Sequence, residues 1–190
     1  MVESVEGLLA KVAEEVRVCT ACPLHQSRIK AVPGEGSSNA PVMFVGEAPG
    51  KDEDEQGRPF VGRSGQLLRQ TIRDVGWEEG DVFIANVLKC RPPGNRDPEK
   101  SEIAACQRFL QAQIVLLQPK VIVTLGRYSM ELLISPDLKI TKVRGQHISK
   151  DGLLYLPTFH PSYILRNRNA LPDFRRDLAV AKKLCEVPTC

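Results

Sequence analysis

The chain has 190 residues, 42% of them hydrophobic, and a formal net charge of +3, which suits one compact domain with a buried core. No stretch approaches the roughly 18 consecutive apolar residues of a membrane span, and acids interrupt the amino-terminal apolar stretch where a signal peptide would be continuous. We therefore expect a single domain over residues 1–190, in a cytoplasmic protein without a membrane partner.

Apolar residues recur with helical spacing over residues 4–17, with Ser4 as the expected cap. Further helical patterns cover residues 64–76, 98–117, 127–134 and 172–185. The second of these opens with Asp97 as the expected cap and Pro98 at the first helical position. Four short apolar runs between the helical patterns are typical of buried strands, and they span residues 41–46, 81–90, 120–126 and 153–160.

The alternation of apolar strands with helices predicts an α/β fold, a three-layer sandwich with a four-stranded parallel central sheet and helices on both faces. Ligands of such sheets bind beyond the carboxyl ends of the strands. Those ends carry the sequences GEAPG, ANVLKC, LGRYS and FHPSY. We therefore expect these four loops to converge on one site.

Six cysteines are many for a cytosolic chain, and the spacing of four of them suits a metal site. A CxxC pair holds two thiolates on one tight turn, the usual way to present ligands to zinc or to an iron–sulfur cluster. A disulfide and buried inert thiols are the alternatives. Cys185 and Cys190, near the end of the chain, stay unexplained, either as a disulfide or as incidental thiols. The four candidate metal ligands are Cys19, Cys22, Cys90 and Cys106.

Polar side chains follow three of the expected strands. Glu47 comes directly after the first, so its carboxylate is expected in the site, whereas the acids at residues 52–55 suit a solvated shoulder of the loop. Asn86 ends the second strand. Its amide can both donate and accept, so it could bind the edge of a base, and a turn-forming role is the alternative. His160 ends the fourth strand, and its role could be catalytic or structural. The glycines match neither the Walker A nor the Rossmann spacing, which argues against a nucleotide triphosphate site.

Positive charge gathers in the carboxyl-terminal third of the chain. Residues 139–176 contain eight lysines and arginines and two aspartates, an excess of six positive charges. This excess suits binding of a polyanion such as nucleic acid, and a solvated basic face is the alternative.

Three segments, GEAPGKDEDEQGRPFVGRSGQLL, NVLKCRPPGNR and HPSYILR, together with the order of the cysteines, resemble the family 4 uracil-DNA glycosylases of thermophilic bacteria and archaea. The resemblance runs from about Val18 to Arg176. It implies a four-stranded parallel sheet and a structural [4Fe-4S] cluster. It also implies removal of uracil from single- or double-stranded DNA in base excision repair. None of these identities follows from spacing alone.

The resemblance also assigns roles to individual residues. Glu47 and His160 would be catalytic, with His160 contacting uracil O2, while Phe60 would stack on uracil and Asn86 would hydrogen-bond its edge. The substrate-binding set would be Gly46, Ala48, Phe60 and Asn86. The residues that contact DNA would be Ser162, Tyr163, Leu165 and Arg166. The cluster ligands would be Cys19, Cys22, Cys90 and Cys106.

The first loop departs from the best known uracil glycosylases, which carry a water-activating aspartate and a thymine-excluding tyrosine where this chain has Ala48 and Gly50. Glu47 is therefore the candidate water activator. The group that rejects thymine is unidentified, which leaves hypoxanthine and xanthine open as substrates. Relatives that bind uracil-DNA covalently carry a basic insertion after this loop. This chain passes from EQG directly to RPFVGRSG without such an insertion, which argues against covalent binding. No lysine stands in a Schiff-base motif, so we expect a monofunctional enzyme.

The alternative is a noncatalytic nucleic-acid-binding module with a structural metal site made by the four cysteines. A zinc protein of this kind would be colourless and would leave a uracil oligonucleotide intact. In either case we expect a monomer. A sliding clamp is a further candidate partner, although no clamp-binding peptide is evident in the sequence.

Overall fold

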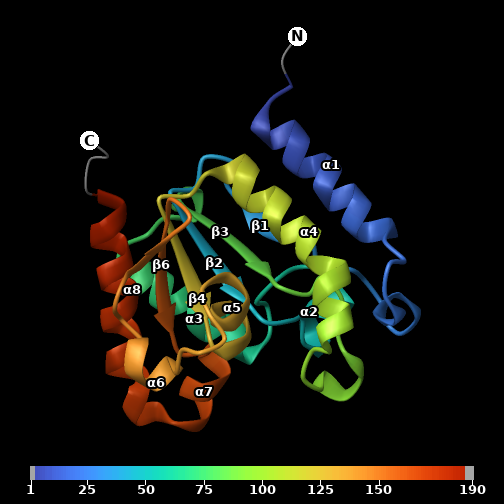
Figure 1. The fold of residues 1–190 in the computed structure, drawn as a ribbon. Helices are drawn as coiled ribbons and strands as arrows, with labels where there is room; N and C mark the ends of the chain where they lie inside the picture. Colours follow the sequence, from blue (N-terminus) through green and yellow to red (C-terminus); the bar gives the residue numbers. More distant parts are fainter. Residues whose placement is uncertain (1–2, 187–190) are drawn as a thin grey trace.

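The computed structural model describes residues 3–186, which contain a six-stranded sheet with the strand order β1-β3-β2-β4-β6-β5 (Figure 1). The four central strands run parallel, and the edge strands β1 and β5 pair antiparallel with β3 and β6. The prediction of a four-stranded parallel sheet is correct for the four central strands. It is wrong for the whole sheet, which has two further, antiparallel strands at its edges. The strands are β1 (Glu35–Gly36), β2 (Val42–Gly46), β3 (Val82–Asn86), β4 (Val121–Leu125), β5 (Ile148–Lys150) and β6 (Leu153–Thr158).

The sequence pattern did not predict the two edge strands, because they are too short to show a periodic apolar signal. β1 has two residues and β5 has three. β5 is joined to β6 by a tight hairpin in which Asp151 and Gly152 both have positive φ, the conformation that two-residue hairpin turns require. Edge strands this short also offer little backbone for pairing with another chain.

The helices expected from apolar periodicity are present, each within two residues of the predicted bounds, and three shorter helices join them. None of the described helices is long and apolar enough to cross a membrane. The helices are α1 (Val5–Val18), α2 (Lys51–Gln56), α3 (Arg63–Asp74), α4 (Lys100–Leu117), α5 (Arg127–Leu133), α6 (Ile140–Val143), α7 (Pro161–Arg166) and α8 (Leu171–Glu186). The described part of the chain also contains four 3-10 turns, at η1 (Pro23–Gln26), η2 (Glu79–Asp81), η3 (Pro93–Asn95) and η4 (Arg168–Ala170).

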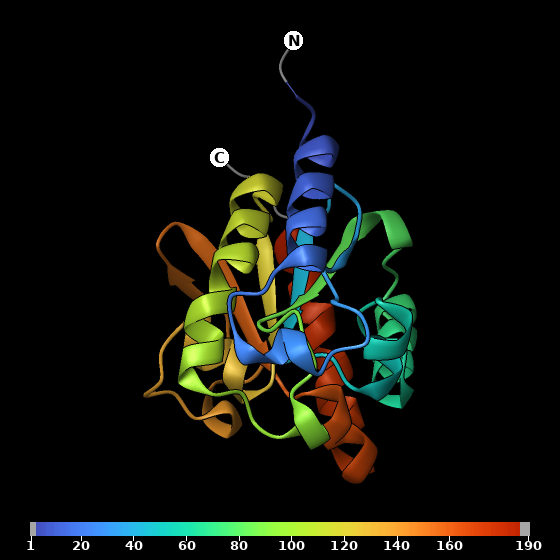
Figure 2. The ribbon, with the colours of Figure 1, turned by 90° about the vertical axis from the view of Figure 1, so that its right-hand side faces the viewer.

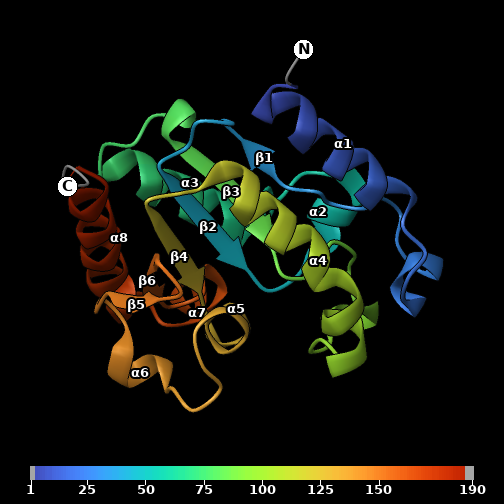
Figure 3. The ribbon, with the colours of Figure 1, turned by 45° about the horizontal axis from the view of Figure 1, so that its top comes forward.

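Helices cover both faces of the sheet, as the α/β pattern predicts. Side chains of α3, α7 and α8 pack on one face, and those of α4 and α5 pack on the other. Figure 2 shows α1 beside α4, outside the sheet, and Figure 3 shows the same arrangement from above. Because successive strand residues point to opposite faces, Phe44 of β2 contacts the first group of helices and Met43 the second.

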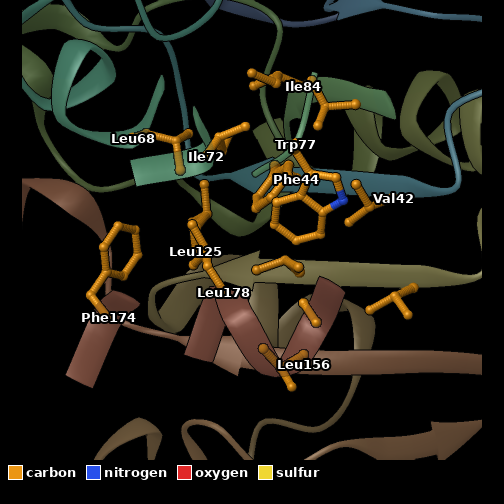
Figure 4. Close-up of a cluster of buried hydrophobic side chains, with 14 of the residues drawn as sticks. Val42, Phe44, Leu68, Ile72, Trp77, Ile84, Leu125, Leu156, Phe174 and Leu178 are labelled. Carbon is orange, nitrogen blue, oxygen red and sulfur yellow. The ribbon is translucent and has the colours of Figure 1, made fainter. Parts of the chain in front are cut away.

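The core on the α3 and α8 side is centred on an aromatic pair (Figure 4). The rings of Phe44 and Trp77 meet edge to face, with their centroids 5.4 Å apart and an interplanar angle of 90°. This is a favoured geometry for aromatic side chains. Trp77 follows α3 and thereby attaches that helix to the sheet.

Helix α1 begins as predicted, because the Ser4 hydroxyl oxygen accepts a hydrogen bond of 3.1 Å from the Gly7 amide. Helix α4 does not. The prediction that Asp97 caps it is wrong, because the cap is Glu99, whose amide donates at 2.9 Å to the side chain of Glu102. The buried Glu102 carboxylate also forms an ion pair with Arg96, so the turn before α4 is held by charge rather than by Asp97.

Candidate active site

A cavity of about 200 Å³ lies beyond the carboxyl ends of β2, β3 and β6, the edge toward which the strand arrowheads point in Figure 1. Three of the four expected loops line it. The fourth loop, after β4, lies behind the β6 loop: Gly126 has a φ of 90°, and a Cβ atom there would stand 2.9 Å from the Cβ of His160. The predicted site residues that line the cavity are Glu47, Ala48, Phe60, Asn86, His160 and Ser162.

Asn86 is the last residue of β3 and is 2% exposed. Its side-chain oxygen Oδ1 is buried and has no hydrogen-bond partner. An unpaired buried acceptor costs about 1–3 kcal/mol, and buried polar atoms are rarely left so without a functional reason. Asn86 therefore offers an unsatisfied acceptor to a ligand that donates a hydrogen bond inside the cavity.

Phe60 lies beside Asn86 in a backbone conformation that few large residues adopt, with a φ of 52°. Arg69 of α3 holds this conformation, because its guanidinium donates to the carbonyl oxygens of Phe60, at 2.9 Å, and of Pro59, at 2.7 Å. Gly46 makes the close approach possible: a Cβ atom there would stand 2.4 Å from Asn86 Oδ1 and 2.5 Å from the Phe60 ring. The site therefore needs glycine at position 46.

His160 caps helix α7, and its ring orientation is defined by its Nδ1 atom. The Ser162 amide donates to Nδ1 at 3.1 Å, and the Ser162 hydroxyl lies 2.8 Å from the same atom. Burial, with a smaller contribution from the nearby Arg166 charge, lowers the pKa of His160 to about 4. The ring is therefore neutral at pH 7, with its proton on Nε2, the nitrogen left to donate.

Glu47 follows β2 directly, and its main-chain oxygen accepts from the Leu88 amide at 2.9 Å. Burial raises the pKa of its carboxyl from 4.5 to about 7; the Asp97 charge adds to this effect and the Arg127 charge opposes it. A carboxyl with a pKa near the working pH is suited to accept a proton from water. Glu47 thus has the property expected of a general base.

The acids at residues 52–55 form helix α2, and the prediction that all four are solvated is wrong for two of them. Glu53, which is 8% exposed, accepts from the amides of Val61 at 2.9 Å, Gly62 at 2.8 Å and Gly50 at 3.1 Å. Asp54, which is 2% exposed, accepts from the Ile29 amide at 2.9 Å. Glu53 therefore ties together the loops beside the cavity, Asp54 attaches α2 to the segment at Ile29, and the other two acids are exposed.

The predicted DNA-contacting segment becomes helix α7, which begins at the cavity. Tyr163 and Arg166 are exposed on it, Leu165 is half-buried, and the Tyr163 ring packs on Phe159 at 4.7 Å between centroids. None of these three side chains lines the cavity, whereas Ser162 does. The helix therefore presents them beside the cavity mouth.

Part of the positive charge counted in the carboxyl-terminal third is neutralised within the fold. The half-buried Arg144 forms an ion pair with the buried Asp177 of α8, and its guanidinium also lies near Asp173. Arg175 pairs with Asp74 at 2.9 Å. The surface available to a polyanion is therefore less basic than the residue count predicts.

The four cysteines predicted as metal ligands line one common cavity between α1, the segment after β3, and α4. Backbone or guanidinium N–H groups point at three of the sulfur atoms: Ala21 at Cys19 (3.5 Å), Arg28 at Cys90 (3.2 Å) and Lys89 at Cys106 (3.3 Å). Donors of this kind stabilise thiolates. Four sulfurs and their donors fit a thiolate-ligated group.

Burial raises the pKa of the Cys106 thiol to about 11, and that of Cys90 is raised too, so a metal group must displace their protons on binding. Within residues 3–186, no group of three or more histidines, cysteines and carboxylates is arranged to hold one metal ion. A four-iron cluster differs, because each thiolate binds a different iron. Cys185 is a free, buried thiol, and Cys190 lies outside the described residues.

Several residues of the cavity were not expected from the sequence. Asn95 and Arg96 reach it from the turn η3, which a left-handed Gly94 allows to fold back over the β3 end. The prolines and glycine of RPPGNR signal a tight turn, although not its position over the cavity. Pro49 and Gly50 belong to the expected GEAPG loop, and the remaining unexpected residues are Glu53, Ser64 and Pro92.

Comparison with known proteins finds one matching family model, the uracil DNA glycosylase superfamily, over residues 33–182. The type-4 uracil-DNA glycosylase of Thermotoga maritima is 51% identical over 166 residues, 86% of each chain. The type-4 enzyme of Sulfurisphaera tokodaii is 47% identical over 189 residues, which cover 95% of this chain and 86% of the relative. A type-5 uracil-DNA glycosylase of Thermus thermophilus is 32% identical over 121 residues, about half of each chain.

Proposed function

Since this chain belongs to the uracil-DNA glycosylase superfamily, we propose that it excises uracil from DNA as a type-4 enzyme of base excision repair. It is a monofunctional hydrolase that acts on single- or double-stranded DNA and leaves an abasic site. The observation that carries this assignment to the cavity is the buried, unpaired Oδ1 of Asn86, an acceptor without a partner at the end of β3.

Asn86 reads the edge of a base that has been flipped out of the stack. Its Oδ1 accepts from uracil N3–H, and its Nδ2 donates to uracil O4. Cytosine has a donor and an acceptor in the reverse places, so it would leave buried groups of the amide unpaired. Phe60 stacks on the base, and these contacts offset the few kcal/mol spent in unstacking it. Gly46 and Ala48 complete this substrate-binding wall.

His160 stabilises the leaving group. When the bond between C1′ of the sugar and N1 of uracil breaks, the electron pair stays on uracil and its charge is spread mainly onto O2. The neutral His160 ring, with Nδ1 occupied by Ser162, donates a hydrogen bond from Nε2 to this oxygen. A donor prepositioned for developing negative charge is the principle of an oxyanion hole.

Glu47 activates the water that attacks the sugar. As the water oxygen bonds to C1′, the carboxylate takes its proton, and the raised pKa of Glu47 makes it a stronger base than an ordinary carboxylate. Water thus replaces uracil on the sugar without a covalent enzyme intermediate.

The DNA strand passes over α7, where Tyr163, Leu165 and Arg166 enter the duplex and Ser162 links the helix to His160. The exposed Arg166 contributes positive charge toward the phosphates. The enzyme is a single-domain monomer of the cytoplasm, and a sliding clamp is a further candidate partner.

The four-sulfur site holds a [4Fe-4S] cluster, whose contribution when bound is to cross-link distant segments of the chain. Its ligands come from the end of α1, from the segment after β3 and from α4. Purified protein that contains the cluster would be brown and would absorb near 400 nm. A colourless zinc protein without cleavage activity would support the alternative, a noncatalytic nucleic-acid-binding module. The ligands are Cys19, Cys22, Cys90 and Cys106.

The assignment is tested with His160→Ala and Asn86→Ala in a uracil oligonucleotide that is cleaved by alkali at abasic sites. Each substitution should lower uracil release at least about 100-fold, because each removes an interaction with the reacting base. The matched controls, His147→Ala and Asn39→Ala, change exposed residues outside the cavity and should leave release unchanged. Release within threefold of wild type from both site variants would refute the assignment.

A further inference from the structure

A lysine with no role in the proposed chemistry lies between the cysteine site and the base-reading pocket. Lys89 is 1% exposed, and it is among the largest fully buried side chains of the described residues. Its ammonium donates to the main-chain oxygen of Asn86 at 3.0 Å and to the side-chain oxygen of Gln113 at 2.7 Å. Its own amide donates to the Cys106 sulfur at 3.3 Å.

The two acceptors of the ammonium are neutral, which is unusual for a buried charge. Gln113 is fixed in turn, because its Nε2 donates to the Pro33 carbonyl oxygen at 2.8 Å and so directs its own oxygen at Lys89. Lys89 also lines the cavity that the four cysteines share. Once a metal group has displaced the thiol protons, the thiolates would stabilise a buried ammonium at this position.

The backbone links the same two places. Residues 86–90 run from the pocket to the cysteine site, and the amides of Val87 and Leu88 donate to the carbonyl oxygens of Gly46, at 3.0 Å, and Glu47, at 2.9 Å. Within this segment, the Asn86 carbonyl is held by the Lys89 ammonium. The Asn86 main chain is therefore held by a side chain that also lines the cysteine cavity.

We propose that Lys89 is a positioning residue that couples the four-cysteine site to uracil recognition by holding the Asn86 main chain. The inference rests on the proposed function, because it concerns the amide that reads uracil. Lys89 does not touch the substrate. Its effect is on the affinity for the base and on the discrimination between uracil and cytosine, rather than on the affinity for DNA.

The test uses Lys89→Met, which keeps the length of the side chain and removes its donors. We expect inhibition by free uracil to weaken at least about tenfold, the effect of one lost positioning contact, while binding to abasic-site DNA and absorption near 400 nm stay at wild-type values. Lys89→Arg should restore part of the uracil affinity. The matched control is Lys120→Met, since Lys120 also donates to a main-chain oxygen at 3.0 Å, that of Cys185, away from the pocket.

Unchanged inhibition by uracil in a folded Lys89→Met protein would overturn the proposal. A parallel loss of uracil inhibition, abasic-site binding and absorption would also overturn it, because it would show a general structural role. If Lys89→Met fails to fold, Gln113→Met, which removes the other acceptor of the ammonium, takes its place. Its inhibition by free uracil is then compared with its binding to abasic-site DNA and its absorption near 400 nm, and the same outcomes decide. A wild-type protein that releases no uracil would instead refute the proposed function.

Discussion

Replacement of Glu47 by glutamine should lower activity and raise stability at the same time, because this half-buried carboxylate supports catalysis and destabilises the fold. The change keeps the size of the side chain and its capacity for hydrogen bonds, and it removes the group that accepts the proton of water. General base catalysis contributes about 10²–10⁴-fold to rates. We therefore expect kcat/KM for uracil release at pH 8 to fall at least about 100-fold.

The pH dependence follows from the pKa of Glu47, which burial raises to about 7. The ionised fraction of such a carboxyl is about one tenth at pH 6 and about nine tenths at pH 8. Wild-type kcat/KM should therefore rise roughly tenfold across this interval. His160, with a pKa near 4, stays neutral throughout and adds no slope. In Glu47→Gln the residual rate should not depend on pH.

The stability change has the opposite sign. Because the folded-state pKa of Glu47 lies above its usual 4.5, the folded protein binds this proton more tightly than the unfolded chain does. The free energy of unfolding therefore falls as the pH rises from about 4.5 to 7 and stays lower above it. A pKa moved from 4.5 to about 7 corresponds to ~3 kcal/mol for a fully buried group, and solvent around this half-buried carboxyl reduces the expected effect to ~1–2 kcal/mol.

Two measurements test this reasoning: single-turnover uracil release between pH 5.5 and 8.5 (about three pH units, spanning the ionisation of Glu47) and urea unfolding at pH 5 and 8. The control is Glu55→Gln, which changes an exposed acid of α2 and should alter neither quantity. The reasoning fails if the wild-type rate is flat across this range. It also fails if Glu47→Gln is less stable than wild type at pH 8.

Two further substitutions test the walls of the pocket. Gly46→Ala places a methyl group 2.4 Å from Asn86 Oδ1, so it should abolish inhibition by free uracil and lower uracil release at least about 100-fold, with little loss of DNA binding; wild-type inhibition would contradict this geometry. Glu53→Gln leaves the amide of Gly50 facing a donor and weakens two other hydrogen bonds, so the free energy of unfolding should fall by about 2 kcal/mol, against less than about 0.5 kcal/mol for Glu55→Gln. Equal losses of unfolding free energy in Glu53→Gln and Glu55→Gln, measured by urea unfolding, would show that the hydrogen bonds of Glu53 do not stabilise the fold.

Local pattern was sufficient for most of the secondary structure and for the position of the pocket. The helical periodicity of α1, α3, α4 and α8 and the apolar runs of β2, β3, β4 and β6 reflect the burial of one face or of both, which each segment encodes by itself. Polar residues at the ends of β3 and β6, Asn86 and His160, could be predicted to meet because parallel strands share one carboxyl edge.

Other features depended on partners that are distant in the chain. Glu53 was predicted to be a solvated acid, and only the amides of Val61 and Gly62, which donate to it, make it a buried one. Nothing in the sequence around Lys89 predicts that its ammonium meets Gln113 of α4. The short edge strands β1 and β5 likewise exist only because a neighbouring strand lies within reach.

Periodicity and motifs alone are enough to predict the class of fold, the family and the residues that stand at the strand ends. Contacts between distant segments are needed to know which of the acids are buried, that the Asn86 acceptor has no partner, and that the pKa of Glu47 lies near 7. Periodicity records only which face of a segment is buried. Solvation, charge and hydrogen bonding at one atom are set instead by whatever the rest of the chain places within a few ångströms of it.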